Sequence, residues 1–210
     1  MTKHTYKLVY VDHRGRAECI RLMFRYFNTD FEDARVEITP EVKEQAPMKQ
    51  VPFLELDGGK VVLCQSVAIC RYLAKSIDPE VWFGGATKTD SAKVDMYADA
   101  FADVFNMSSG AFYSDPSIRE KSIELFKVNV RNRLTILEGC LAKSKGQYFV
   151  GKKVHWCDIY ALAVLGNLEE VEAGVLDHVP LLRKYYLHMR DLPEIRDYIQ
   201  SNWPATTYTE

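Results

Sequence analysis

The sequence lacks long apolar runs, an excess of charge of one sign, internal repeats and low-complexity segments. Its longest uninterrupted apolar run, residues 159–165, has seven residues, whereas a membrane-spanning helix needs about 20. The 27 basic and 29 acidic residues leave a net charge of −2, so no general attraction to the phosphates of nucleic acids is expected. Residues 1–5 show no apolar segment of a signal peptide. We therefore expect a soluble cytoplasmic protein with neither a membrane nor a nucleic-acid partner.

Closely spaced cysteine pairs are also absent, because the five cysteines are scattered and no Cys-x-x-Cys occurs. A disulfide framework is therefore not expected, and a zinc site would lack the close-set Cys and His pairs that it needs. His155 and Cys157 lie near each other, but no second pair stands beside them, which favours structural roles. We expect no metal and reduced, buried thiols. The cysteines are Cys19, Cys64, Cys70, Cys140 and Cys157.

The chain is long enough for one large domain or two small ones, with 210 residues of which 47% are hydrophobic and 12% aromatic. This composition excludes a disordered chain. Strand-like and helix-like apolar patterns alternate in the first part, which predicts an α/β thioredoxin-like domain of order βαβαββα over residues 4–81. The predicted strands are 6–11, 34–38, 51–56 and 61–63, and the predicted helices are 16–27, 40–46 and 65–76.

Turn-forming residues at 78–79 and 84–85 mark a linker, and no strand pattern follows it. The remaining apolar periodicity is helical, and two of the three shorter segments begin with a proline at a first helical position. We therefore predict an all-α C-terminal domain over residues 83–207. Its predicted helices are 91–108, 116–143, 157–171, 180–191 and 193–202.

Tyr10 ends the first predicted strand, just before the loop that leads into the first helix. Ligands of open α/β sheets bind at this edge, and a phenol there can donate a hydrogen bond to a developing anion. A structural alternative is a strand tyrosine that packs against the second domain, since tyrosine is common in strands. Tyr6 shares its face but lies at the opposite end of the strand.

Two further segments lie at the same edge of the predicted sheet. Pro52 opens a predicted strand, so it is either a residue of an edge strand or the second residue of a cis peptide bond. A cis bond would leave the backbone N–H and C=O of Val51 free to pair with an extended peptide. Ser66, after Gln65, is either a helix cap or part of an anion site at a helix N-terminus. Arg16 and Lys43 could neutralise a second carboxylate. Together these features suit an acidic, extended, peptide-like ligand.

Three blocks of sequence at these spacings resemble the cytosolic glutathione S-transferases, from Tyr6 to about residue 203. The similarity is greatest to the sigma class, which includes the haematopoietic prostaglandin D synthases and a nematode branch. The blocks are Tyr-Lys-Leu-Val-Tyr with the following Arg14-Gly15-Arg16-Ala17-Glu18, then Val51-Pro52-Phe53-Leu54-Glu55-Leu56-Asp57-Gly58, and Gln65-Ser66-Val67-Ala68-Ile69-Cys70-Arg71-Tyr72-Leu73.

The resemblance implies a homodimer that binds glutathione. It makes Tyr10 the catalytic tyrosine and Arg16 the arginine that supports the thiolate. Lys43 then binds the glycine carboxylate, and Asp99 reaches the γ-glutamyl amine from the partner subunit. The other implied contacts are Gln50 and Val51 before cis-Pro52, for the cysteinyl backbone, and Gln65 and Ser66, for the γ-glutamyl carboxylate.

The implied reaction is attack of a Tyr10-stabilised glutathione thiolate on a hydrophobic electrophile held between the domains. Two alternatives stay open: a glutathione-dependent isomerase of the prostaglandin type, and a non-enzymatic carrier of hydrophobic ligands or haem. A thiol-disulfide reductase of glutaredoxin type is disfavoured, because it needs a low-pKa cysteine at the start of the first helix. The candidate wall of the second-substrate site is formed by Val11, His13, Phe105, Met107 and Tyr208.

The chain departs from the family pattern at three places. Thr39 replaces a common tryptophan, which weakens a contact to the glycyl end, and Lys49 stands where glycine is common, which adds charge beside the groove. At the start of a C-terminal helix, His155 replaces the usual Ser or Thr three residues before Asp158. The reciprocal capping box is therefore expected to be incomplete, at some cost in stability.

Overall fold

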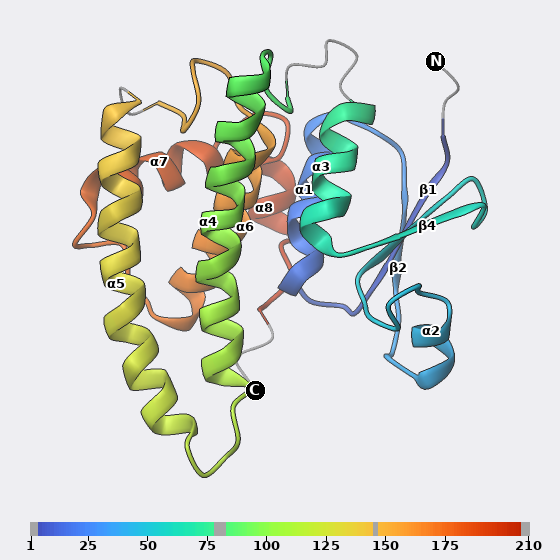
Figure 1. The fold of residues 1–210 in the computed structure, drawn as a ribbon, viewed down its shortest axis with the longest axis horizontal. Coiled ribbons are helices and arrows are strands. Elements are labelled where there is room, and N and C mark those ends of the chain that lie inside the picture. Colours follow the sequence, from blue (N-terminus) through green and yellow to red (C-terminus); the bar gives the residue numbers. More distant parts are fainter. Residues whose placement is uncertain (1–3, 78–82, 145–146, 207–210) are drawn as a thin grey trace.

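Four strands form one mixed sheet in the N-terminal part of the chain, and the computed structural model describes residues 4–77, 83–144 and 147–206 (Figure 1). The sheet order is β2-β1-β3-β4, with β1 and β2 parallel and the other neighbouring pairs antiparallel. The predicted order βαβαββα is confirmed. Its elements are β1 (Tyr6–Tyr10), the 3₁₀ turn η1 (Gly15–Ala17), α1 (Glu18–Tyr26), β2 (Glu32–Arg35), α2 (Pro40–Glu44), β3 (Phe53–Leu56), β4 (Val61–Cys64) and α3 (Ser66–Ser76).

The strands alternate between two faces of the sheet, as the pleat requires. Leu8 and Tyr10 belong to the main hydrophobic core with residues of α1 and α3, whereas Val9 packs with Ala46 and Phe53 on the opposite face, beside α2. Figure 1 shows α1 and α3 lying between the sheet and the C-terminal helices. Tyr10 therefore points toward the junction of the two parts of the chain.

The second strand begins earlier than predicted, at Glu32 instead of residue 34, and it ends at Arg35. Apolar alternation misplaced it because β2 is an edge strand whose side chains are held by charge. Asp33 is 3.0 Å from the guanidinium Nε of buried Arg21 and 2.9 Å from Nη2 of Arg35. The pairing of β2 with β1 continues through the N–H of Val36, which donates to the Tyr10 carbonyl at 2.8 Å.

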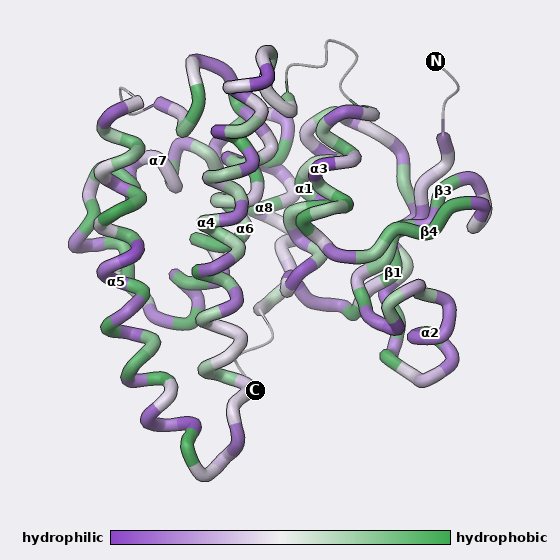
Figure 2. Tube along the Cα trace, viewed as in Figure 1, coloured by the Kyte–Doolittle hydropathy of each residue, from purple (hydrophilic) through white to green (hydrophobic). Residues whose placement is uncertain are grey.

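Within the described residues, the C-terminal part contains five helices and no strand, so the predicted all-α architecture is confirmed. Helix α6 is buried along most of its length. It packs against α4 and α7 of the C-terminal part and against α1 of the N-terminal part, so it lies at the centre of the molecule (Figure 2). The predicted boundaries 4–81 and 83–207 stay predictions, because residues 78–82 lie outside the described segments. The helices are α4 (Lys88–Phe112), α5 (Arg119–Lys143), α6 (Trp156–Val171), α7 (Pro180–Arg190) and α8 (Arg196–Ser201).

Asp158 anchors the first turn of α6. Its carboxylate accepts the backbone N–H of His155 at 2.8 Å and of Phe149 at 3.1 Å, and the hydroxyl of Tyr185 donates to it at 2.8 Å. The N–H of Asp158 itself bonds to the His155 carbonyl at 2.9 Å. Full burial raises the pKa of Asp158 to about 6, and these hydrogen bonds only partly oppose the shift.

All five cysteines are free, but only three of them are buried as expected. Cys64 and Cys140 are partly exposed. Cys19 of α1 and Cys70 of α3 face each other across the core with their sulfur atoms 3.2 Å apart. No helix in the described segments is both long and apolar enough to cross a membrane.

Candidate functional site

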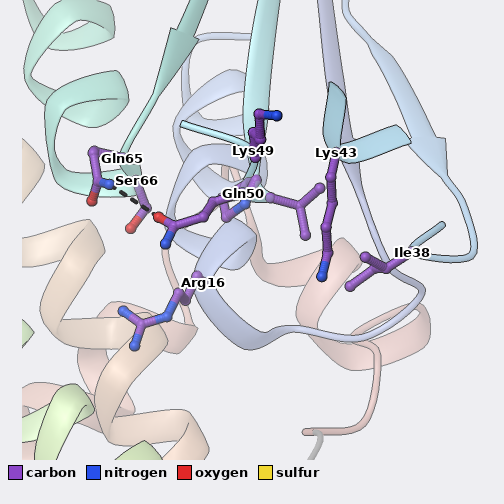
Figure 3. Close-up of a pocket in the computed structure, with 9 residues that line it drawn as sticks. Arg16, Ile38, Lys43, Lys49, Gln50, Gln65 and Ser66 are labelled. Atoms are coloured by element: carbon purple, nitrogen blue, oxygen red, sulfur yellow. Dashed lines mark hydrogen bonds between the residues drawn. The ribbon is translucent and has the colours of Figure 1, made fainter. Parts of the chain in front are cut away.

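A cleft of about 490 Å³ opens at the carboxyl end of β1, beside the first turn of α3. This volume is within the range of small-molecule sites. Figure 3 shows Gln65 and Ser66 on one side of it, Lys43 and Ile38 on the other, and Gln50 between them. Seven of the nine residues predicted for the glutathione site lie here. The lining is Arg16, Ile38, Lys43, Lys49, Gln50, Val51, Pro52, Gln65 and Ser66.

The lining carries three cations and no carboxylate. Lys49 is partly neutralised by Glu44, whose carboxylate lies 2.7 Å from its ammonium group, but both side chains are well exposed. Arg16 and Lys43 stand at opposite sides of the cleft (Figure 3). The cleft therefore favours a ligand with a net negative charge.

The first turn of α3 supplies a second attraction for anions. Gln65 precedes the helix with a φ of +68°, a conformation that L-residues rarely adopt, and its side chain makes no capping bond. It instead donates to the Gln50 side chain at 3.3 Å. The free N–H groups of this turn, the Ser66 hydroxyl and the positive end of the helix dipole are thus arranged for a carboxylate.

The segment before β3 presents backbone to the cleft. The Val51–Pro52 bond is cis, so the interpretation of Pro52 as the second residue of a cis bond is confirmed. Pairing of β3 with β1 begins only at Phe53, and in the described part of the chain Val51 makes no backbone hydrogen bond outside the helices and strands. Its N–H and C=O can therefore pair with an extended ligand.

The departures at Thr39 and Lys49 have visible structural effects. Thr39 caps α2, because its hydroxyl oxygen accepts the N–H of Val42 at 3.3 Å, and α2 carries Lys43 into the cleft. Lys49 adopts a φ of +51°, which explains why glycine suits this position.

Tyr10 does not line the cleft, and only 8% of it is exposed, but Arg16 connects the two. The hydroxyl oxygen of Tyr10 accepts the backbone N–H of Arg16 at 3.2 Å, so the hydroxyl proton is left for another acceptor. Burial raises the pKa of Tyr10, and the Arg16 N–H and guanidinium offset this only in part. Tyr10 therefore stays protonated at neutral pH, and its hydroxyl can donate a hydrogen bond.

The loop after Tyr10 is held by a buried arginine. Arg21 of α1 donates to the carbonyl groups of His13 at 2.7 Å and Val11 at 3.1 Å, and it is paired with Glu18 at 3.3 Å. The His13 ring meets the Tyr10 ring edge-on, with the centroids 5.6 Å apart. These contacts fix the position of the phenol relative to the cleft.

Residues 6–75 match the family described as "Glutathione S-transferase, N-terminal domain", and residues 102–202 match "Glutathione S-transferase, C-terminal domain". The chain belongs to the glutathione S-transferase family. Enzymes of this family use glutathione as their cosubstrate.

Individual relatives agree with this assignment. The transferase is 37% identical to "Glutathione S-transferase 1" of Ascaris suum, over 97% of this chain and 98% of that protein. It is 30% identical to the human "Hematopoietic prostaglandin D synthase", over 93% and 95% of the two chains. The crystal structure of a glutathione S-transferase from Ascaris lumbricoides superposes with a TM-score of 0.83 at 35% identity, covering 96% of this chain and 98% of that one.

Not every residue predicted for the site lies beside the cleft of the transferase. Asp99 projects from α4 with 61% of its side chain exposed, and its nearest charged partner is Arg71 at 3.4 Å. Phe105 lines a small cavity between the domains, whereas Met107 lines a separate hollow between α4 and α5. Val11 and His13 flank Tyr10 in the loop held by Arg21. Tyr208 lies outside the described residues.

Sequence reasoning missed three residues that contact Tyr10 or Arg16 or that share a cavity wall with Arg16. Gly15 allows the close approach of the Tyr10 hydroxyl, because a Cβ at this position would lie 2.5 Å from it. Asn106 accepts a hydrogen bond from the Arg16 guanidinium at 3.0 Å. Asn167 lines the small cavity between the domains. Its signal in the sequence was a lone amide two residues after the longest apolar run, residues 159–165.

Proposed function

We propose that this transferase ionises the thiol of glutathione with the hydroxyl of Tyr10 and adds the resulting thiolate to a hydrophobic electrophile. The observation that supports the proposal is the protonated, buried Tyr10, whose oxygen already accepts the Arg16 N–H and whose proton is therefore directed elsewhere. It stands at the turn that joins the cationic cleft to the cavity between the domains.

The cleft suits the charges of glutathione, which carries two carboxylates and one ammonium group at neutral pH. In our proposal the γ-glutamyl carboxylate occupies the first turn of α3 at Ser66. The cysteinyl backbone pairs with Val51 as an added strand, and the glycine carboxylate meets Lys43. This orientation directs the thiol toward Arg16 and Tyr10.

The free energy required is within reach of one hydrogen bond. A free thiol has a pKa of about 8.5, and lowering it by about two units takes roughly 2.7 kcal/mol of preferential stabilisation of the thiolate. A hydrogen bond to a charged group contributes about 1.5–3 kcal/mol. The Tyr10 hydroxyl can thus supply most of the stabilisation, with the positive charge of Arg16 adding to it.

Replacement of the phenol tests the proposal. Tyr10→Phe should reduce turnover with a model electrophile by at least about tenfold, since one lost bond to an ionised group is worth at least about 1.4 kcal/mol. Its affinity for glutathione should change little. The matched control is Tyr6→Phe, on the same face at the other end of β1, which should keep full turnover. An unchanged turnover of Tyr10→Phe would exclude the catalytic role.

We further propose that the protein is a sigma-class homodimer of the cytoplasm in which Asp99 reaches the glutathione of the partner subunit. Its separation from its own cleft and its exposure support this assignment. The similarity to a prostaglandin D synthase keeps an isomerase role open, because the same thiolate would serve it. Product analysis with conjugation and isomerisation substrates, beside displacement of a bound hydrophobic dye or haem, separates these roles from simple carriage.

A further inference from the structure

The segment that follows α8 is attached to the residues on either side of η1. The indole Nε1 of Trp203 donates to the carboxylate of Glu18 at 2.7 Å, and the carbonyl of Ala205 accepts the backbone N–H of Arg14 at 3.1 Å. The Arg14 guanidinium also lies over the Trp203 ring, 4.4 Å from its centroid. Three contacts thus join this end of the C-terminal part to the turn that leads into α1.

The ring of Trp203 is closely confined. It lies against the backbone of Gly166 on α6, where a Cβ would be only 2.3 Å from the Cη2 atom of the indole. The guanidinium of Arg190, at the end of α7, lies 5.7 Å from the ring centroid. Because α6, α7 and the turn before α1 all meet the ring, the direction of its N–H group is fixed.

The acceptor of this N–H group, Glu18, is fully buried. Its second carboxylate oxygen lies 3.3 Å from the guanidinium of Arg21, which donates to the carbonyl groups of His13 at 2.7 Å and Val11 at 3.1 Å. A buried carboxylate that loses one of its donors is desolvated without compensation, so it shifts toward the partners that remain. Loss of the indole N–H would therefore displace Glu18 and Arg21, and the loop after Tyr10 would move with them.

We propose that Trp203 is a positioning residue, which acts through Glu18 and Arg21 to hold the Tyr10 hydroxyl in place for the thiol of glutathione. This inference rests on the proposed function of Tyr10. A second route runs through η1, because the turn held by the C-terminal segment carries Arg16, whose N–H is bonded to the Tyr10 hydroxyl at 3.2 Å. Trp203 therefore links the docking of the C-terminal segment to the ionisation of the thiol.

The variant Trp203→Phe tests this role, because it keeps an aromatic ring and removes the N–H group. We expect the pKa of the bound thiol to rise by about one unit, which lowers kcat with a model electrophile about fivefold near pH ~6.5 at saturating glutathione. The loss should fade above pH ~9, where the thiol is ionised in both enzymes. The KM for glutathione should change less than about twofold, since Lys43 and Ser66 belong to α2 and α3.

The matched control is Tyr185→Phe, which removes a hydroxyl donor from another fully buried carboxylate, that of Asp158, at 2.8 Å. It should lose comparable stability in urea unfolding and keep both the kcat and the thiol pKa of the unmodified enzyme. A second variant, Gly166→Ala, leaves every hydrogen-bonding group in place and displaces the indole. It should raise the thiol pKa and lower kcat in the same direction as Trp203→Phe.

A thiol pKa that is unchanged in folded Trp203→Phe, or that rises equally in Tyr185→Phe, would overturn the inference. Full turnover by Gly166→Ala would also overturn it, and this variant decides the question if Trp203→Phe does not fold. If the unmodified enzyme itself leaves the thiol pKa at its free value, the proposed function fails and the role of Trp203 fails with it. A lowered pKa that Trp203→Phe retains refutes the positioning role alone.

Discussion

Replacement of Gly15 by alanine should disable the site without replacing any side chain that contacts glutathione in our account. A Cβ at Gly15 would lie 2.5 Å from the hydroxyl oxygen of Tyr10 and 3.0 Å from its Cε1 atom. Ordinary contacts of a Cβ begin at about 3.4 Å, so the hydroxyl must move by nearly 1 Å. The ring has little room for this movement, because Tyr10 is buried and packs edge-on against His13.

Two magnitudes follow from this geometry. The φ of +41° at Gly15 costs an alanine about 1–2 kcal/mol in stability, and a shift of about 1 Å in a positioned group can cost about 100-fold in rate. We therefore expect Gly15→Ala to lose about 100-fold in kcat at saturating glutathione. The assay is turnover of a model electrophile, together with urea unfolding to measure the loss of stability.

The matched control is Gly58→Ala in the turn between β3 and β4. Gly58 has a similar left-handed φ of +69°, but a Cβ there would meet nothing within 4 Å. It should lose a comparable 1–2 kcal/mol of stability and retain its turnover. If Gly15→Ala keeps more than half of the original kcat, or if both variants lose turnover equally, the position of the Tyr10 hydroxyl is not what limits catalysis.

Three further outcomes are expected. Asp99→Asn should weaken glutathione binding only in a dimer, and tight binding by a monomer in sedimentation would contradict the cross-subunit role. Lys49→Gly should raise the free energy of unfolding by about 0.5–1 kcal/mol in urea titrations, because glycine adopts the φ of +51° without strain; a decrease would contradict this. Burial raises the pKa of Asp158 from 3.8 to about 6, so its charged form is disfavoured in the folded state. Its contribution to stability is then complete below pH 3.8 and declines by about 3 kcal/mol up to pH 6, a slope that Asp158→Asn should lack in urea unfolding at each pH.

The order of secondary structure could be predicted from the sequence because each element carries its own apolar period. Tyr6 to Tyr10 alternate and Ile20, Met23 and Phe24 repeat as a helix does, and the structure forms a strand and a helix there. The method failed at β2, where Asp33 and Arg35 are held by ion pairs that no local pattern reveals. An edge strand stabilised by charge has no hydrophobic period to find.

The cleft could be predicted from the same pattern because strand ends and helix starts meet at one edge of the sheet. Val51 lies just before β3, Gln65 lies between β4 and α3, and Ser66 begins α3. All three residues line the cleft. The contacts between distant elements could not be predicted. Arg16 donates to Asn106, and Asn167 lines the same small cavity as Gly15, only because α4 and α6 pack against the N-terminal part.

The most direct measurement of the central claim is the ionisation of glutathione on the enzyme. Ultraviolet absorbance of the thiolate, followed against pH in the binary complex, should give a pKa about two units below the free value of about 8.5. The same titration of Tyr10→Phe should return close to the free value. A bound thiol in the unmodified enzyme that ionises no more readily than free glutathione would contradict the account.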